Sequence, residues 1–162
     1  MKNDIYTYRE ITKKKYLDKL KRYCAYQDRC HKEVREKLEK LKVDEDIADE
    51  IIAELIKENF LNEERFARSF VRGKYRIKKW GRNKIIQHLK QKEISTYLID
   101  RSLQEIDEEE YIANLKDLLE KKYALCKTAD KYEQRKKLYR FARNKGYEHE
   151  LINEILEELI LY

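Results

Sequence analysis

The chain has 162 residues, of which 43% are charged and 41% are apolar, with three glycines and no proline. At this length about 70% of the surface of the unfolded chain can be buried, which allows one or two ordinary domains or a short repeat array. The lack of proline and the scarcity of glycine exclude folds that depend on tight hairpin turns or glycine-rich loops. The composition therefore predicts an all-α protein.

The sequence also argues against a membrane protein and against a metal-binding protein. No stretch reaches about 18 consecutive apolar residues, and the first ten residues lack the apolar segment of a secretory signal. We therefore expect a soluble, cytoplasmic protein that does not contact a membrane. Cys24, Cys30 and Cys126 are odd in number and lack the spacing of a zinc site, so they are interpreted as reduced thiols. The sequence predicts no metal and no cofactor.

The net charge of +6 is distributed unevenly along the chain. Residues 1–61 carry +1, residues 62–106 carry +7 and residues 107–162 carry −2. From Arg65 to Lys92 there are eleven basic residues and no acid. This central imbalance is the strongest functional signal in the residues themselves, and it favours a phosphate-bearing partner.

A repeat is visible when the chain is compared with itself. Three segments of 22 residues, which begin at Val34, Ile85 and Leu138, align without gaps, and several columns are apolar in all three. These columns are Val34/Ile85/Leu138, Val43/Ile94/Tyr147, Ile47/Leu98/Leu151, Ala48/Ile99/Ile152, Ile52/Leu103/Leu156 and Leu55/Ile106/Leu159. The last four columns have the spacing of the buried face of an amphipathic helix.

Each aligned segment follows a longer apolar stripe, so each repeat is predicted to contain three helices. The stripes predict first helices at roughly 13–29, 63–79 and 108–125. The expected organisation is an N-terminal tail over 1–12 and three-helix units over 13–61, 62–106 and 107–162. A unit of about 50 residues buries little core by itself, so we expect adjacent units to pack in an elongated, slightly curved array.

Capping residues support these boundaries. The predicted N-caps are Asp44, Asn62, Ser95 and Asp107, the last in a capping box with Glu110. Gly81 and Gly146 fall where helices should end, and both are predicted to have the left-handed backbone conformation of a helix terminator.

Basic side chains recur along one face of the predicted helix 63–79. They are Arg65, Arg68, Arg72, Arg76 and Lys79, and Lys74, Lys78, Arg82 and Lys84 extend the field. Like charges at i,i+4 cost a few tenths of a kcal/mol per pair, so this face is destabilising unless an anion meets it. We expect these residues to bind DNA or a DNA filament. The alternative is a solvated face balanced by acids such as Asp44, Glu45 and Asp46.

Trp80, the only tryptophan, lies at the end of the basic helix. Its ring either stacks on a base or a partner protein, or covers the gap between two helices, and the second interpretation is favoured. His31, His88 and His149 occupy similar places in the repeats and do not converge on one pocket. No nucleophile and base have the spacing of a catalytic motif, so the sequence predicts that the protein is not an enzyme.

The segment from Phe60 to Ile94, FLNEERFARSFVRGKYRIKKWGRNKIIQHLKQKEI, resembles the central repeat of the RecX family of bacterial recombination regulators. The matching positions are Phe60-Leu61-Asn62-Glu63-Glu64-Arg65-Phe66-Ala67, Gly81, Ile85/Ile86, Leu89 and Ile94. The flanking CAYQDRCHKEVREKLEKL and NKGYEHELINEILEEL resemble the first and third repeats, so the resemblance covers about residues 20–160. Cys30 stands where the family commonly has serine, which is the better helix cap.

This resemblance implies a non-enzymatic regulator without a cofactor, acting in DNA repair by homologous recombination and in the SOS response. Such a protein binds the RecA recombinase filament along its helical groove, contacts the bound DNA, and inhibits strand exchange, ATP hydrolysis and co-protease activity.

The other hypothesis is a helical protein that binds single- or double-stranded DNA through the basic central repeat, without a recombinase partner. The two differ in whether tight binding requires the filament. No heptad seam of a coiled-coil dimer is present, and a monomer is expected.

Overall fold

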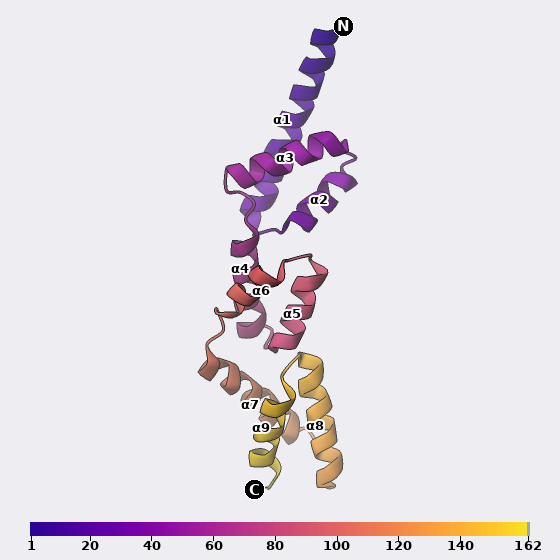
Figure 1. The fold of residues 1–162 in the computed structure, drawn as a ribbon. Helices are drawn as coiled ribbons and strands as arrows, with labels where there is room; N and C mark the ends of the chain where they lie inside the picture. The colour runs from indigo at the N-terminus through magenta and orange to yellow at the C-terminus, as the bar shows by residue number, and fades with distance from the viewer. Residues whose placement is uncertain (162) are drawn as a thin grey trace. The chain divides into compact units, whose positions relative to one another are not determined.

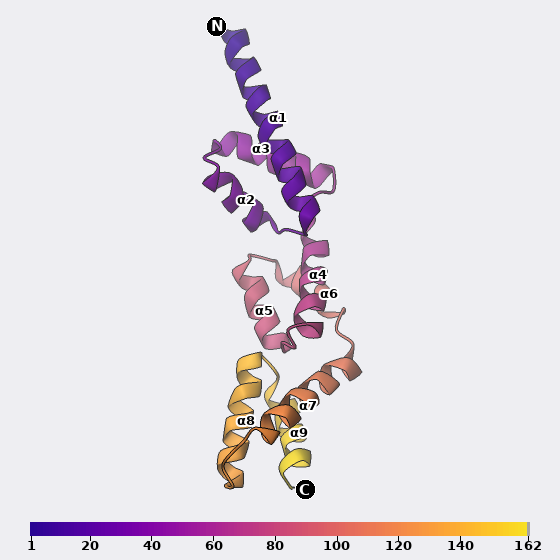
Figure 2. The ribbon, with the colours of Figure 1, turned by 180° about the vertical axis from the view of Figure 1, so that it is seen from behind.

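The computed structural model describes residues 1–161, which form nine α-helices and no strand (Figure 1, Figure 2). The helices are α1 (Lys2–Tyr26), α2 (His31–Lys40), α3 (Glu45–Lys57), α4 (Glu63–Arg76), α5 (Arg82–Gln91), α6 (Thr96–Leu103), α7 (Glu108–Ala124), α8 (Lys131–Lys145) and α9 (His149–Leu161). The predicted all-α fold of tandem three-helix repeats is confirmed. Helix α1 begins at Lys2, so the segment expected to be a tail is helical.

The chain forms two compact units. The first consists of residues 1–67 with 92–94, and the second of residues 68–91 with the chain from Ser95 onward. One boundary therefore falls within α4, and the second repeat contributes to both units.

The core of the first unit is formed by α1, α2 and α3. Its buried side chains are Leu20, Cys24, Val34, Leu38, Ile47, Ala48, Ile51, Ile52, Leu55 and Leu61. Several of them, including Val34 and Ile52, belong to the columns that recur in the sequence. Burying one such aliphatic side chain stabilises the folded state by about 1.5–3 kcal/mol. The repeated columns therefore supply much of the stabilisation from this core.

The second unit has its largest core where α7, α8 and α9 pack together (Figure 1, Figure 2). Its buried side chains are Tyr111, Leu115, Leu119, Leu138, Ala142, Tyr147, Ile152, Ile155, Leu156 and Ile160. The column residue Leu103 of α6 is only half-buried, whereas its counterpart Leu156 is fully buried. The same sequence column therefore has unequal burial in different repeats.

Three of the predicted caps are formed. The side-chain oxygens of Asn62, Ser95 and Asp107 accept hydrogen bonds from backbone N–H groups in the first turn of the following helix, at 2.9, 3.3 and 2.8 Å. Asp44 makes no side-chain cap hydrogen bond. The carboxylate of Glu110 accepts a hydrogen bond from the Tyr75 hydroxyl at 3.2 Å, and only the Asp107 half of the predicted capping box is observed at the start of α7.

The two glycines predicted to terminate helices have different roles. Gly146 ends α8 with φ 97°, in the left-handed region, as predicted. The prediction for Gly81 is wrong, because the left-handed residue after α4 is Lys79, with φ 56°. Gly81 instead donates its N–H to the carbonyl of Lys145 at 2.8 Å. A Cβ at Gly81 would lie closer than 3.0 Å to the backbone of Gly146 and Tyr147, so only glycine fits this contact between the second and third repeats.

Candidate functional site

The basic side chains of α4 do not form one continuous face. Lys74 lies two residues after Arg72, which places it about 200° further round the helix. Arg68, Arg72 and Arg76 recur at i+4 spacing on one side. The central cations therefore divide into two groups whose surroundings differ. The arginine group is Arg65, Arg68, Arg72, Arg76 and Arg82, and the lysine group is Lys74, Lys78 and Lys84.

Glu105 neutralises the middle of the arginine group. Its two carboxylate oxygens lie 2.9 Å from Arg68 Nη1 and 3.2 Å from Arg72 Nη1. The hydrogen bond from Arg68, followed by the one from Arg72, lowers the pKa of the Glu105 carboxyl. This pairing offsets part of the like-charge repulsion that the sequence pattern predicts along α4.

Arg76 and Lys79 continue the pattern toward α7. Arg76 Nε donates to the Tyr75 hydroxyl at 2.9 Å and lies 3.5 Å from the carboxylate of Glu110. Lys79 Nζ donates to Asn114 Oδ1 at 2.8 Å, and the Asn114 amide donates in turn to the Tyr75 carbonyl at 3.0 Å. Asn114 is buried, so these hydrogen bonds satisfy polar groups that would otherwise be costly to bury.

Arg65, at the start of the stripe, has a structural role in the first unit. Its Nε donates to Asp28 at 2.8 Å. Its Nη2 donates to the backbone carbonyls of Asn59 and Phe60 at 3.1 and 3.2 Å. These bonds fix the connection between α3 and α4.

Arg82, at the start of α5, has the most complete set of partners. Its guanidinium pairs with Glu108 and, at 3.1 Å, with Glu148, and it lies 4.2 Å from the centre of the Tyr111 ring. Its backbone N–H donates to the Tyr111 hydroxyl at 2.9 Å, and that hydroxyl donates to Glu148 at 2.7 Å. The Tyr147 hydroxyl donates to the carbonyl of Lys79 at 2.8 Å beside this network. Burial raises the pKa of both tyrosines, which keeps them protonated.

The lysine group surrounds Trp80. The ammonium groups of Lys74 and Lys84 lie 4.8 and 4.5 Å from the centre of the indole, and the His88 ring packs 4.6 Å from it. Phe70 meets the indole edge-on at 6.5 Å. Trp80 is half-buried between α4 and α5, so its ring covers the junction of two helices while it holds two cations at the surface.

Lys78 differs from the arginines in having no neutralising partner. It is exposed, and within residues 1–161 it pairs with no carboxylate. The acids that meet the arginine group are Asp28, Glu105, Glu108, Glu110 and Glu148. They are not the acids expected from the sequence, because each lies more than 25 residues along the chain from the arginine or tyrosine that it meets.

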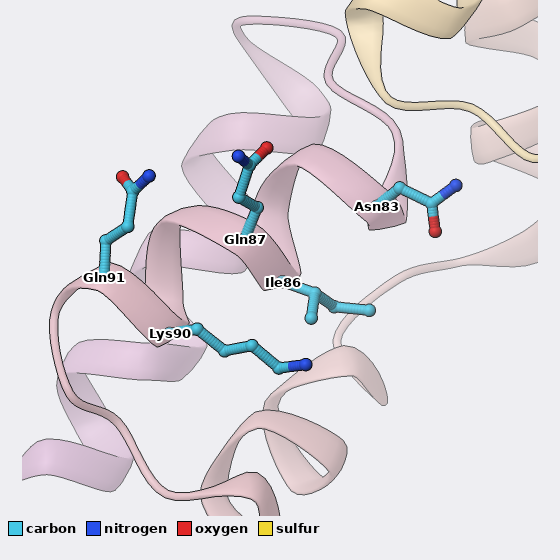
Figure 3. A pocket seen from close by; sticks show the side chains of 5 residues that line it. All are labelled: Asn83, Ile86, Gln87, Lys90 and Gln91. Atoms are coloured by element: carbon cyan, nitrogen blue, oxygen red, sulfur yellow. The ribbon is translucent and has the colours of Figure 1, made fainter.

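A shallow pocket of about 460 Å³ lies along α5 (Figure 3). It is lined by Asn83, Ile86, Gln87, Lys90 and Gln91. Gln87 and Gln91 project from one side of the helix, and Ile86 and Lys90 project from another (Figure 3). The five lining residues include no carboxylate, hydroxyl or thiol, so this pocket offers hydrogen-bond donors and a positive charge and has no acid–base or nucleophilic pair.

Across residues 1–161, no three His, Cys, Asp or Glu side chains are placed to hold a metal ion. Over the same residues, none of the helices has the length and apolar character needed to span a bilayer.

Comparison with protein families gives three matches in chain order. Residues 17–55 match the first three-helix domain of RecX, residues 62–103 the second and residues 108–156 the third. The matched boundaries follow the helix triplets described above. Each of the three repeats therefore has a counterpart in one family.

Individual relatives agree with these matches. The regulatory protein RecX of Clostridium perfringens strain 13 is 36% identical over 130 residues, which is 79% of this chain and 60% of the relative. That of Bacillus cytotoxicus is 31% identical over 152 residues, 94% of this chain and 56% of the relative. The chain thus spans somewhat less than two thirds of the length of these relatives.

Two solved structures share the fold. The crystal structure of RecX from Lactobacillus salivarius superimposes with a TM-score of 0.81 at 27% identity, covering 93% of this chain and 97% of the other. A second crystal structure, of a regulatory protein RecX, gives a TM-score of 0.79 at 23% identity, covering 92% of this chain and 72% of the other. The second likeness concerns the fold alone.

Proposed function

We propose that this chain, which belongs to the RecX family of regulatory proteins, binds the DNA filament of the RecA recombinase and lowers its activity. The observation that carries the proposal is the match of all three successive three-helix domains to this family, from residue 17 to residue 156. The regulated activities are strand exchange, ATP hydrolysis and the co-protease function, in keeping with the resemblance seen in the sequence. The protein acts by binding and does not itself catalyse a reaction.

The surface that we assign to filament-bound DNA is the lysine side of the second repeat. Lys74 and Lys84 hold their ammonium groups over the Trp80 ring, and Lys78 is an exposed cation close by in the chain. Phosphates attract such cations and release their counterions, which makes binding dependent on salt. The amide and lysine side chains along α5, among them Asn83 and Lys90, extend this surface.

The arginine group has a different role in this proposal. Arg68 and Arg72 already share the carboxylate of Glu105, and Arg82 is held by Glu108 and Glu148. A phosphate could reach these arginines only in competition with those acids. We therefore assign the arginine group mainly to holding the second repeat in shape.

A second candidate function is DNA binding without a recombinase partner. The eleven basic residues between Arg65 and Lys92 favour it, because sequence-independent affinity for nucleic acid follows from such a density of cations. This candidate predicts equal binding to naked DNA and to a DNA filament.

Co-sedimentation separates the two functions. The protein is mixed with RecA filaments assembled on single-stranded DNA, with the same DNA alone, and with RecA alone, and the pellet is quantified. We expect strong recovery with the filament, weak recovery with DNA alone, and a fall in the filament's ATPase rate at the same protein concentrations. Equal recovery on naked DNA with an unchanged ATPase rate would favour the second candidate and contradict the first.

A further inference from the structure

The third repeat carries another basic surface, which the net charge of its sequence does not reveal. Residues 107–162 have a net charge of −2. All eleven of their lysines and arginines nevertheless fall between Lys116 and Lys145, and nine of their thirteen acids fall outside that segment. Several of these cations surround one groove, which is called here the third-repeat groove.

The third-repeat groove has a volume of about 500 Å³ and is lined by the end of α7, the loop that follows it and one face of α8. Three of its lining residues are apolar, and they are called here the floor: Leu125, Cys126 and Phe141. Four of its lining residues are basic, and they are called here the rim: Lys122, Lys127, Lys137 and Arg140. None of the lining residues is acidic.

The rim cations are not neutralised by the protein itself. All four are exposed, and within residues 1–161 none of them pairs with a carboxylate. Cations elsewhere in the third repeat do find acids: Lys116 pairs with Glu158 at 3.3 Å and Lys121 with Asp117 at 2.8 Å. Within the described chain, the groove thus gathers cations without carboxylate partners, whereas other parts of the repeat contain ion pairs.

The floor of the groove is unusual for a surface exposed to solvent. Leu125 is 74% exposed and lines the same groove as the four cations. The Phe141 ring beside it is half-buried, with the ammonium groups of Lys122 and Lys145 at 5.2 and 6.0 Å from its centre. Apolar and unpaired basic side chains that line one groove are complementary to a ligand with one apolar group and nearby carboxylates.

We propose that the third-repeat groove binds an acidic segment of a partner protein, with one bulky apolar side chain of that segment packed on Leu125 and Phe141. The flanking carboxylates of the segment pair with Lys122, Lys127, Lys137 and Arg140. Nucleic acid fits this groove less well. Phosphates would satisfy the cations but leave Leu125 in water, and two ammonium groups already approach the Phe141 ring on which a base would stack. The inference depends on this groove alone and is independent of the function proposed above.

The binding test uses a fluorescent peptide of aspartate and glutamate with one central leucine, and a second peptide in which serine replaces that leucine. We expect the leucine peptide to bind about fivefold or more tightly than the serine peptide, because only the leucine buries apolar surface on the floor. Leu125→Ser should abolish this difference between the two peptides. Leu125 is largely exposed, so the variant is expected to fold, which circular dichroism checks.

The rim is tested by charge reversal with a matched control. Lys127→Glu with Lys137→Glu should weaken binding of the leucine peptide about tenfold at low salt, and by less as salt rises. The control is Lys131→Glu with Lys136→Glu, two exposed lysines of α8 that do not line the groove and give the same net charge. The control should bind like the unmodified chain.

Cys126 provides a readout at the groove itself. Cys24 and Cys30 are buried, whereas Cys126 is half-buried in the groove floor, so a thiol reagent should modify Cys126 first. The leucine peptide should slow this modification. The inference is overturned if the peptide leaves modification unchanged, or if both double variants bind it equally. It is also overturned if a single-stranded oligonucleotide protects Cys126 and the peptide does not.

Discussion

The second and third repeats use their basic residues in opposite ways. The second repeat has the larger positive charge, yet its arginines are held by carboxylates, with Glu105 shared between Arg68 and Arg72. The third repeat is acidic overall, yet the cations at the rim of its groove have no acid partner within residues 1–161. Net charge along a sequence therefore does not locate the positive charge that remains available to a partner. That charge depends on which acids the fold brings close.

The largest expected effect concerns the contact that joins these two repeats. Gly81→Ala should lower the free energy of unfolding by about 3 kcal/mol or more, because its Cβ would overlap the backbone of Gly146 and Tyr147. Gly73 is the matched control, since a Cβ there meets nothing within 4 Å and the residue lies inside α4. Gly73→Ala should stabilise the protein by about 0.5–1 kcal/mol. Urea unfolding measures both, and equal effects would contradict the close contact.

The next effect distinguishes a paired cation from an unpaired one. Arg82→Gln should lower the free energy of unfolding by about 2 kcal/mol, because it leaves the Glu148 carboxylate and the Tyr111 ring without the guanidinium that they face in a partly buried site. Lys78→Gln should change the stability by less than about 0.5 kcal/mol, since Lys78 is exposed and unpaired within residues 1–161. Equal losses in the free energy of unfolding for the two variants would contradict the distinction between the arginine and lysine groups.

A smaller effect has a defined pH dependence. The pKa of Glu105 is lowered in the folded state by Arg68 and then Arg72, so its stabilising effect is present above the ordinary pKa of a glutamate and is lost as the pH falls through the lowered value. Glu105→Gln should destabilise the protein by up to about 1 kcal/mol at neutral pH. The difference should shrink on acidification, as the unmodified carboxyl becomes protonated. Unfolding measured at neutral and acidic pH checks this, and a constant difference would contradict the pairing.

The smallest effect belongs to the third-repeat groove. Lys127→Gln with Lys137→Gln should leave the free energy of unfolding within about 0.5 kcal/mol of the unmodified chain, because neither lysine has a structural partner. A loss greater than about 1 kcal/mol would mean that these lysines stabilise the fold. The groove would then be part of the structural charge network, as the arginine group is.

The fold could be predicted from the sequence because apolar periodicity is a local signal. The column containing Val34, Ile85 and Leu138 is fully buried in all three repeats, as its pattern indicates. Burial of other columns could not be predicted as well: Leu103 is half-buried and Leu156 fully buried, because each meets a different neighbouring helix. The role of Gly81 was also missed, since close approach of two backbone segments leaves no trace in local spacing.

The candidate site was predictable only in outline. The sequence identified the basic central segment and Trp80, but it could not identify Glu105 or Glu148 as partners, because both come from connections between helices that lie outside the basic run. The division of α4 into an arginine side and a lysine side follows from helix geometry and could have been read from the positions of Arg72 and Lys74. The signal of the third-repeat groove was present as the separation of acids from bases within residues 107–162.

The central claim is that the lysine side of the second repeat contacts filament-bound DNA while the arginine side stabilises the repeat. The most direct measurement is the salt dependence of binding to RecA filaments on single-stranded DNA. Two variants are compared with the unmodified chain, Lys78→Gln with Lys84→Gln, and Arg68→Gln with Arg72→Gln. We expect the lysine variant to flatten the slope of log K against log salt by about 0.7 per lost phosphate contact, and the arginine variant to leave it unchanged. A slope flattened only by the arginine variant would contradict this account.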